Sequence, residues 1–440
     1  MAPHIRRRHY PITLALQLIR AMIQKLHSPH PIQERLDSSS PPFATPRILV
    51  IAEFAPGSAG GSWVIIKQLL RGLDWNQIHC WSFYTDESPK PYNFGGRHHS
   101  ANIPSKLSPK LRWKELKGMI LENIAVPYAA RDLQAYIREV QPDFIFFLAH
   151  CWGIPVVNRV MPHVKAHWHL EIHDMPDTAS WVKSMGRRRI DRFMRYTEEL
   201  YLQADSRAVI GPEMAEDMRQ RTGITCANVF RCAVEPEILA RLAEPASPPR
   251  DEIIRIGYAG TILAEATFAR LIVALKKVGS RLNRKIELHL YSWHSYKDRA
   301  WFDPDVVIEH GPKTEAEVYE EYQKMTWGLS IMKLDDDDPR YNRLSFPCKF
   351  TAALAAGIPL ICIGNRHSSL MEMAKDYRLG LVLTEEDEPH FEDRMCEVLP
   401  DFSKFDLYRS EILRCARKEF NAGRNREELH EMMGTVAKRP

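Results

Sequence analysis

Strand-like runs recur along the chain, the first of them apolar without polar alternation, and stretches with helical spacing separate them. The first run is RILVIA at residues 47–52, and the helical stretches include residues 126–140 and 191–204. The later runs are IHCWSF, DFIFFLA, AVIGP, IIRIGYAGTI, IELHLYS, VVIEHG, WGLSIM, PLICIG and GLVLT. A strand that is apolar at every position is covered on both faces, as in a parallel sheet with helices on both sides. The alternation therefore predicts an α/β fold built from doubly wound parallel sheets.

The domain organisation follows from length and from two stretches rich in proline. The 440 residues favour two or three domains. Proline with serine or alanine marks a linker before residue 47 and another near residue 245. The expected divisions are 1–46 (basic leader and linker), 47–235 (first doubly wound domain), 236–250 (linker), 251–402 (second doubly wound domain) and 403–440 (C-terminal helices).

Composition excludes several classes of protein. The chain is 45% hydrophobic and 26% charged, which is ordinary for a globular protein and wrong for a disordered one. Its net charge of +4 is too small to argue for a nucleic-acid partner. The eight cysteines have no zinc-like spacing, and several, such as Cys80 and Cys362, lie in apolar runs. They are expected to be buried free thiols, which favours a reducing, cytoplasmic location.

Residues 5–27 form a basic segment with helical periodicity. One face of the expected helix is apolar: it carries Ile12, Leu16, Ile19, Ile23 and Leu26. The segment is too short and interrupted to span a bilayer, and it lacks a signal-peptide cleavage site. It predicts a peripheral contact with the inner face of a membrane. The alternatives are a helix docked on its own protein and a disordered leader.

Two glycine-containing loops follow predicted strands. Gly60 and Gly61 precede a helix, and Gly260 is followed by Thr261. Glycine lets backbone N–H groups approach an anion, and a helix N-terminus favours negative charge. Both loops are therefore candidate phosphate sites, with an ordinary turn as the alternative in each case.

A lysine lies at the start of the predicted helix FPCKFTAALAAG. The pattern places Pro347 in the first turn and Gly357 at the end. Lys349 then lies near the helix N-terminus, where a cation is unfavourable by itself. A bound anion would remove that penalty. The alternative is an exposed lysine whose stem packs on the surface.

Other polar side chains at strand ends are also candidates. His173 and Asp174 follow one strand and are expected to hydrogen-bond a substrate or take part in proton transfer, or else to be structural. Glu53 and His150 are weaker candidates of the same kind. The run DDDDPR at 335–340 has no fixed ligand geometry, so we expect a solvated loop and no metal.

Several of these pieces, in this order, resemble a known family. They are GSAGGSWVIIKQLLRGL, EIHDMPD, VIGPEMAEDMRQRTGI, VFRCAVEPE, IRIGYAGTI and SFPCKFTAALAAGIPLI. Together they are similar to GT-B glycosyltransferases of family 4, over roughly residues 47–435. The resemblance implies two facing Rossmann-like domains, with a C-terminal helix that crosses back to the first domain. It also implies transfer of a sugar from a nucleotide-sugar donor to a glycan, a lipid-linked saccharide or a small molecule.

The resemblance assigns roles to the candidate residues. Those implied to bind the donor are Gly60, Gly61, Gly260, Thr261, Arg343, Ser345 and Lys349. His173 and Asp174 are the implied catalytic pair. The leaving group is a nucleoside diphosphate, whose developing charge cationic side chains stabilise. The family implies retention of configuration, no required metal and no cofactor besides the donor substrate.

Two departures from the family pattern leave another function open. Ala352 occupies the place of a glutamate that binds the donor ribose in many members, and no basic residue follows the YAG strand until Arg270. The donor is then held differently, with Lys349 and Arg343 carrying more of the phosphate charge, or it is unusual. The alternative is a catalytically silent GT-B-like protein that binds a glycan or a protein partner. A GT-B epimerase or phosphorylase is a further alternative.

Overall fold

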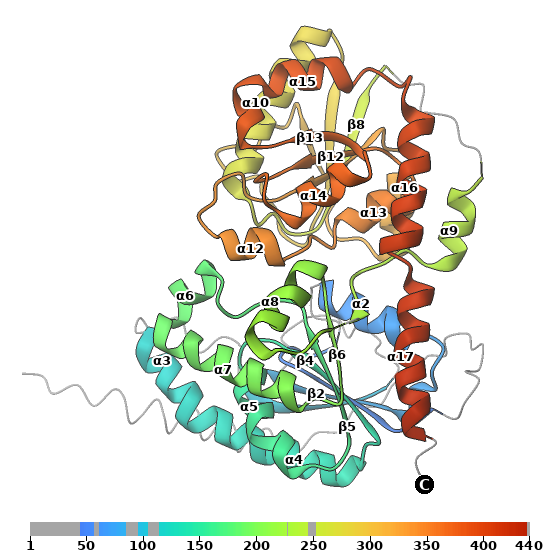
Figure 1. The fold of residues 1–440 in the computed structure, drawn as a ribbon. Helices are drawn as coiled ribbons and strands as arrows, with labels where there is room; N and C mark the ends of the chain where they lie inside the picture. Colours follow the sequence, from blue (N-terminus) through green and yellow to red (C-terminus); the bar gives the residue numbers. More distant parts are fainter. Residues whose placement is uncertain are drawn as a thin grey trace, which may run out of the picture. The chain divides into compact units, whose positions relative to one another are not determined.

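The computed structural model describes residues 45–56, 61–84, 96–103, 114–226, 228–244 and 252–437. Its strands form two parallel sheets: a seven-stranded sheet of order β3-β2-β1-β4-β5-β6-β7 and a six-stranded sheet of order β10-β9-β8-β11-β12-β13 (Figure 1). The predicted α/β class is confirmed. The predicted membrane-contact segment, residues 5–27, lies outside the described residues.

The centre of the first sheet consists of the apolar runs identified in the sequence. β1 (Ile48–Ala52) pairs in parallel with β2 (Ile78–Tyr84) and with β4 (Phe144–Ala149), and every residue of β1 and β4 is buried. β3 (Arg97–Ile103) pairs with β2 at the edge. The surrounding helices are α3 (Lys114–Ile120), a π-helical turn η2 (Leu121–Ala125), α4 (Val126–Val140) and α5 (Gly153–Val160).

Three further parallel strands, β5 (His167–Ile172), β6 (Ser206–Val209) and β7 (Asn228–Val229), continue in chain order. The helices in this part of the sequence are α6 (Ala179–Met185), α7 (Arg187–Gln203), α8 (Pro212–Thr222) and α9 (Pro236–Leu242). Helix α9 falls inside the stretch 236–250 that was expected to be a linker. The earlier helix α2 (Gly61–Leu70) packs with the C-terminal part of the chain, as described below.

The second sheet has a separate apolar core on each face. Its strands are β8 (Ile254–Ala259), β9 (Ile286–Tyr291), β10 (Val307–Glu309), β11 (Trp327–Ile331), β12 (Leu360–Ile363) and β13 (Gly380–Leu383). Successive residues point to opposite faces, so Ile361 joins one core and Cys362 the other. The first core includes α10 (Glu265–Leu282) and α15 (Phe391–Val398). The second includes α11 (Glu315–Tyr322), α13 (Phe350–Ala356) and α14 (Ser369–Asp376).

Two long helices end the described chain, α16 (Phe405–Glu419) and α17 (Ala422–Ala437) (Figure 1). Arg426 of α17 donates from Nη1 to the carbonyl of Gln68 at 3.1 Å, and its Nη2 donates to Glu235 Oε2 at 3.0 Å. His430 Nε2 lies 3.1 Å from the carbonyl of Leu69. The C-terminal helix therefore packs against α2, near the start of the chain.

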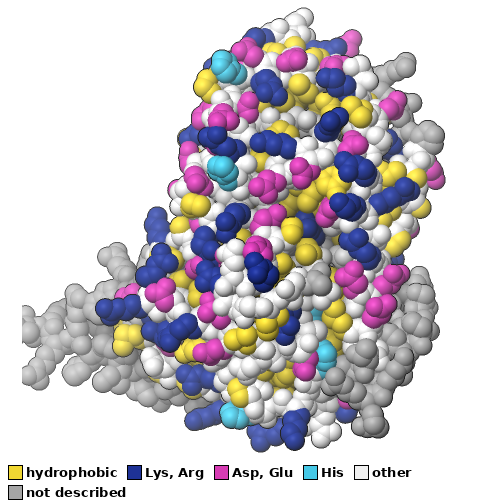
Figure 2. Space-filling view, viewed as in Figure 1, with side chains coloured by type: hydrophobic (Ala, Val, Ile, Leu, Met, Phe, Trp, Pro, Cys, Tyr) yellow, Lys and Arg dark blue, Asp and Glu magenta, His cyan; other side chains and the backbone are white. Residues whose placement is uncertain are grey.

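Packing divides the chain into two compact units. Of the described residues, one unit contains 45–56 together with those between 72 and 168, and the other contains 61–71 together with those from 169 to 437. On the face drawn in Figure 2, basic and acidic side chains are interspersed, with apolar side chains in small groups between them. No helix in the described ranges is long and apolar enough to cross a membrane. The candidate residues from position 61 onward, except His150, belong to the second unit, so the site can be built within it.

Candidate functional site

Lys349 lies immediately before α13. It is the N-cap residue of the helix, which ends at Gly357 in the left-handed conformation (φ 67°), as predicted. The expected position of Pro347 in the first turn is wrong. Residues 347–351 form a turn instead, in which Phe350 N–H donates to the carbonyl of Pro347 at 3.1 Å and Thr351 N–H to that of Cys348 at 3.2 Å. Because of this turn, α13 begins only at Phe350, and Lys349 lies immediately before its first residue.

The ammonium group of Lys349 has little to compensate its charge. Nζ lies 5.4 Å from the ring centroid of Tyr258, on the strand β8. Within the described ranges, no carboxylate forms an ion pair with it. Burial lowers the pKa of Lys349 to about 8, because a charged amine loses solvation there. Lys349 is only partly exposed, and the charge of Cys348 offsets its own in part. A cation without a carboxylate partner is stabilised further by a bound anion.

Gly260 provides the space for this lysine. A Cβ built at Gly260 would lie 2.8 Å from Cε of Lys349, and the residue has a φ of 121° that other residues rarely adopt. The predicted use of its N–H group for phosphate is wrong, because that N–H donates to the carbonyl of Tyr291 at 2.7 Å. Thr261 is partly exposed, and its carbonyl accepts from the Tyr258 hydroxyl at 3.0 Å. The contribution of this loop is therefore space: the side chain of Lys349 lies where a side chain at position 260 would otherwise be.

His173 is buried at the end of β5, with 5% of its surface exposed. Its Nε2 lies 2.5 Å from Oε1 of Glu171, and its Nδ1 lies 2.9 Å from Oγ of Ser62, in the first turn of α2. Burial by itself lowers the pKa of His173, but the charge and hydrogen bond of Glu171 and the charge of Asp174 together raise it above the ordinary value. Both ring nitrogens are therefore occupied within the protein.

Two thiols lie beside this histidine and the lysine. Cys232 holds the pKa of the Cys348 thiol below its ordinary value, against the opposing effect of burial. The charges of His173 and Lys349 lower it further, and the charge of Asp174 opposes them. Cys232 Sγ also lies 3.2 Å from Oγ1 of Thr351, in the first turn of α13. The predicted residues His173, Asp174 and Lys349 all influence Cys348 electrostatically, and they are grouped with it below as one cluster.

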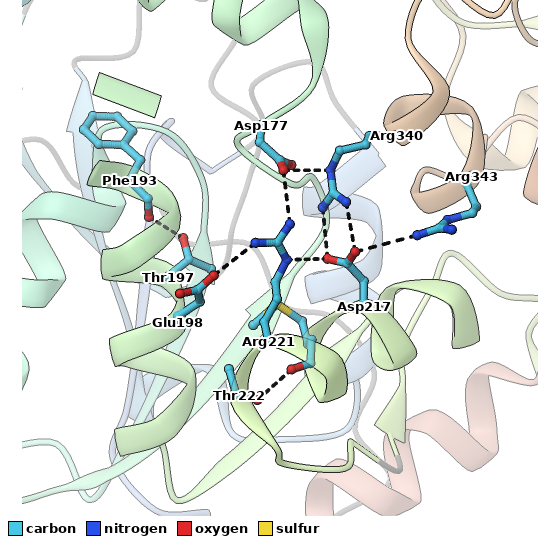
Figure 3. Close-up of polar contacts among 10 residues, drawn as sticks. Asp177, Phe193, Thr197, Glu198, Asp217, Arg221, Thr222, Arg340 and Arg343 are labelled. Atoms are coloured by element: carbon cyan, nitrogen blue, oxygen red, sulfur yellow. Dashed lines mark hydrogen bonds and ion pairs between the residues drawn. The ribbon is translucent and has the colours of Figure 1, made fainter. Parts of the chain in front are cut away.

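Arg343 and Ser345 occupy different surroundings. Arg343 lies on α12 (Pro339–Leu344), is 55% exposed, and its Nη2 lies 3.7 Å from Oδ1 of Asp217 (Figure 3). Ser345 is the C-cap of the same helix, and its carbonyl accepts from Ser369 Oγ at 2.5 Å. Gly61 is the first residue of α2, and Gly60 lies outside the described residues.

A carboxylate network that the sequence did not indicate joins α8 to α12 (Figure 3). Both oxygens of Asp217 accept from the two terminal nitrogens of Arg340 at 2.9 Å, and Oδ2 also accepts from Arg221 Nε at 2.8 Å. Asp177 pairs with Nε of Arg340 at 2.7 Å and with Nη2 of Arg221 at 3.4 Å. This arrangement fixes α12 and thus the start of the turn that carries Lys349.

The aspartate run 335–338 does not converge on one point. Asp335 pairs with Arg270 at 3.6 Å and Asp337 with Lys333 at 3.0 Å. Asp338 accepts from the N–H groups of Tyr341 and Ala179, at 3.3 and 2.8 Å. The described part of the chain has no group of three or more His, Cys, Asp or Glu residues suited to a metal.

The weaker candidates Glu53 and His150 lie in the first compact unit. His150 Nδ1 bonds to Oε2 of Glu53, and Oε1 accepts from the N–H of Trp152 at 3.3 Å. The pair is therefore satisfied internally. Glu171, Ser62, Cys232 and Tyr258 are the residues of the second-unit cluster that sequence reasoning missed. The bond between Ser62 and His173 joins positions 111 residues apart, so no local pattern could reveal it.

The similarity of this chain to known proteins lies in its structure and not in its sequence. No family model matches the chain, and no curated protein sequence matches it. Among solved structures, sucrose-phosphate synthase from Thermosynechococcus elongatus superposes with a TM-score of 0.64 at 14% identity, over 88% of this chain and 98% of that one. The E. coli trehalose-6-phosphate protein bound with UDP-2-fluoro glucose gives 0.58 at 11%, over 90% and 99%. The lipopolysaccharide outer core galactosyltransferase WaaB gives 0.56 at 16%, over 88% and 99%. The chain therefore has the two-sheet α/β fold of GT-B glycosyltransferases.

Proposed function

We propose that the chain is a glycosyltransferase that takes a sugar from a nucleotide-sugar donor and that Lys349 binds the donor diphosphate. The observation that carries the proposal is a partly exposed ammonium group with no carboxylate partner in the described residues and a pKa lowered to about 8. A diphosphate would supply the missing negative charge. As the glycosidic bond breaks, further negative charge develops on the same phosphate, so the lysine lowers the barrier as well as binding the donor.

The other groups of the cluster have roles that follow from their positions. Gly260 admits the lysine stem, and Thr261 supplies a partly exposed hydroxyl beside it. Asp174 is partly exposed next to the buried His173, so its carboxylate is the group of this pair that can meet a sugar hydroxyl. Arg343 is exposed and only loosely held at 3.7 Å, which leaves its guanidinium able to turn to a phosphate.

The first experiment is a thermal-shift screen with UDP, GDP, ADP, CMP and dTDP, each with and without magnesium. UDP is the first probe because the E. coli structural neighbour is bound with UDP-2-fluoro glucose. A nucleotide well above its dissociation constant raises the melting temperature by mass action. Stabilisation by one nucleoside diphosphate, independent of magnesium, supports a transferase that needs no metal.

Variants of Lys349 then test the assignment itself. Lys349→Ala should weaken binding of that nucleotide by about 10- to 100-fold, the usual effect of losing a charge-assisted bond. Lys375→Ala is the matched control, since Lys375 is exposed on α14 and forms no ion pair with any residue that the structure describes. Release of nucleoside diphosphate from the sugar donor measures turnover. Equal binding and turnover by wild type and Lys349→Ala would contradict the assignment.

The second candidate function is a catalytically silent protein that binds a glycan or a protein partner. Ala352 on α13 favours it, because a methyl group stands where the family pattern has a carboxylate for the donor ribose. Failure of every nucleotide in the screen, together with binding to glycans on an array, would select this candidate.

Several finer features belong to the same proposal. The similarity to a lipopolysaccharide outer core galactosyltransferase supports a glycan or lipid-linked acceptor. The anomeric configuration of the product, read by NMR, tests retention. Deletion of residues 1–40 tests peripheral membrane contact, since it should release the protein from anionic liposomes. The cytoplasmic location and the division into an acceptor-side domain (47–235) and a donor domain (251–402) stay predictions.

A further inference from the structure

Glu171 is a fully buried carboxylate with one strong partner. It is 0% exposed, its Oε1 lies 2.5 Å from His173 Nε2, and its Oε2 has no hydrogen-bond partner among the described residues. A buried carboxylate is costly unless a positive charge or hydrogen bonds compensate it. The imidazole of His173 is the group in contact with it, so a proton on His173 offsets the cost.

The protonation state of His173 decides which way the Ser62 hydroxyl points. A neutral imidazole that donates from Nε2 to Glu171 has only a lone pair at Nδ1, so Ser62 must give its hydrogen to that nitrogen. An imidazolium donates from both nitrogens. Ser62 Oγ, 2.9 Å from Nδ1, then accepts, and its own hydrogen becomes available to another acceptor.

Ser62 is placed to use that hydrogen. It is partly exposed in the first turn of α2, directly after Gly61, whereas Glu171 and His173 are buried. His173 also acts electrostatically on Cys348, as does Lys349. On the same helix, Gln68 exchanges hydrogen bonds with the backbone of Ala233 at 2.9 and 3.0 Å, and the neighbouring Cys232 Sγ lies 3.2 Å from Thr351 Oγ1 in the first turn of α13. Helix α2, which carries the hydroxyl, is thereby joined to the helix that follows Lys349.

We propose that Glu171 is a positioning residue of the donor site: it holds His173 as an imidazolium ion, which frees the Ser62 hydroxyl hydrogen to bond a phosphate oxygen of a nucleoside diphosphate. The inference rests on the proposed function. It adds Ser62 as a binding residue, and it adds Glu171 as the residue that decides, through His173, whether the Ser62 hydroxyl can donate its hydrogen to a ligand. The titratable groups that face His173 are Glu171, Asp174 and Cys348, and all three favour the cation.

Histidine NMR tests the relay without any ligand. The His173 signal, assigned by its loss in His173→Gln, should titrate above the ordinary histidine range in the wild type. In Glu171→Gln it should titrate at clearly lower pH, because burial is then opposed only by the weaker effects of Asp174 and Cys348. Glu171→Asp should keep much of the upward shift. Glu53→Gln is the matched control, since Glu53 is a buried carboxylate bonded to His150 instead.

Calorimetry with UDP, or with whichever diphosphate the thermal-shift screen selects, tests the role in binding. The affinity of the wild type should fall as pH rises through the His173 titration, and Glu171→Gln should move that fall to lower pH. Ser62→Ala should weaken binding about tenfold at pH 6 and should abolish the fall of affinity with pH. The pKa of His173 should stay above the ordinary histidine range in this variant. Ser62→Thr keeps a hydroxyl and should restore that fall.

The outcomes separate this inference from the proposed function. A His173 titration that is the same in Glu171→Gln and wild type overturns the relay, as does a Ser62→Ala variant with unchanged affinity and pH profile. If Glu171→Gln does not fold, the Ser62 variants decide the matter. If Lys349→Ala loses binding while Ser62→Ala does not, the proposed function stands and the relay falls. Absence of binding by every diphosphate removes both.

Discussion

Gly260 and Lys349 are in direct contact: a Cβ at Gly260 would lie 2.8 Å from Cε and 3.4 Å from Cγ of the lysine. These two residues lie 89 positions apart and come from the end of β8 and the start of α13. The contact determines where the ammonium group lies, because the stem of Lys349 passes over the bare backbone of the glycine.

Gly260→Ala should therefore displace Lys349 and weaken nucleotide binding. The backbone at φ 121° adds a cost to the fold of about 1–3 kcal/mol for a residue with a side chain. Gly311→Ala is the control, because Gly311 has a φ of 73° but open space around its missing side chain. We expect both variants to lose stability in chemical denaturation and only Gly260→Ala to lose affinity. If Gly260→Ala and Gly311→Ala bound the nucleotide equally well, the contact between Gly260 and Lys349 would not position the lysine.

Lys349→Met should stabilise the fold at neutral pH while removing nucleotide binding. The pKa of Lys349 falls from an ordinary 10.5 to about 8 in the fold, so the unfolded chain holds this proton more tightly. At pH 7 the charged lysine costs stability, on the order of 2 kcal/mol, and the cost fades as pH rises from 8 to 10.5. Denaturant titrations at pH 7 and 10 should therefore give a gain for Lys349→Met only at pH 7. Lys375→Met, at an exposed position, should give none.

The affinity for a nucleoside diphosphate should also fall at high pH. Above about pH 8 the free protein loses the Lys349 proton, which binding must then restore, so the dissociation constant should rise about tenfold per pH unit. The phosphate itself does not change charge in this range, since its second pKa is near 6. Lys349→Arg should bind with little dependence on pH up to 10, because arginine stays charged. Parallel curves for the two proteins would contradict the role of Lys349.

The sequence predicts the buried strands of this fold well and its polar edges poorly. β1 and β4 are apolar runs with no polar interruption, which only strands covered on both faces require, and β2 and β8 follow mostly apolar runs. β3 reads RHHSANI and lies at a sheet edge, where polar residues are tolerated. Its composition therefore carries no strand signal.

For the site, the sequence predicted which residues are candidates but not which side chains contact them. Lys349, His173 and Gly260 were found because they follow or precede regular elements at strand ends, where α/β folds bind ligands. The partners that give them their properties, Glu171 and Ser62, come from the interior of a strand and from another helix. Such pairings depend on tertiary packing, which a single sequence does not encode in its spacing.

Cys348 should be the most reactive partly exposed thiol. Its pKa lies below the ordinary thiol value, first because of the neighbouring Cys232 and then because of the charges of His173 and Lys349. The thiolate is the nucleophile, so iodoacetamide should label Cys348 at pH 7 faster than Cys396, the other partly exposed cysteine. Peptide mass mapping measures the labelling. Lys349→Ala should slow the labelling of Cys348 at pH 7, and a bound diphosphate should protect it.

Asp217 should be the main electrostatic support of α12. It is 6% exposed and accepts hydrogen bonds from Arg340 and Arg221, which lower its pKa although burial opposes them. A carboxyl group with a lowered pKa stabilises the fold above its ordinary pKa, and this contribution is lost as pH falls through the lowered value. Asp217→Asn should therefore reduce the free energy of unfolding by about 1–3 kcal/mol at pH 7, because two arginines lose a shared partner, and by much less near pH 2. Glu216→Gln is the control on the same helix. The ion pair between Glu216 and Arg219 is exposed, so the Glu216→Gln variant should have the melting temperature of the wild type at pH 7. A loss of stability that is the same at both pH values would assign the effect of Asp217→Asn to packing and not to charge.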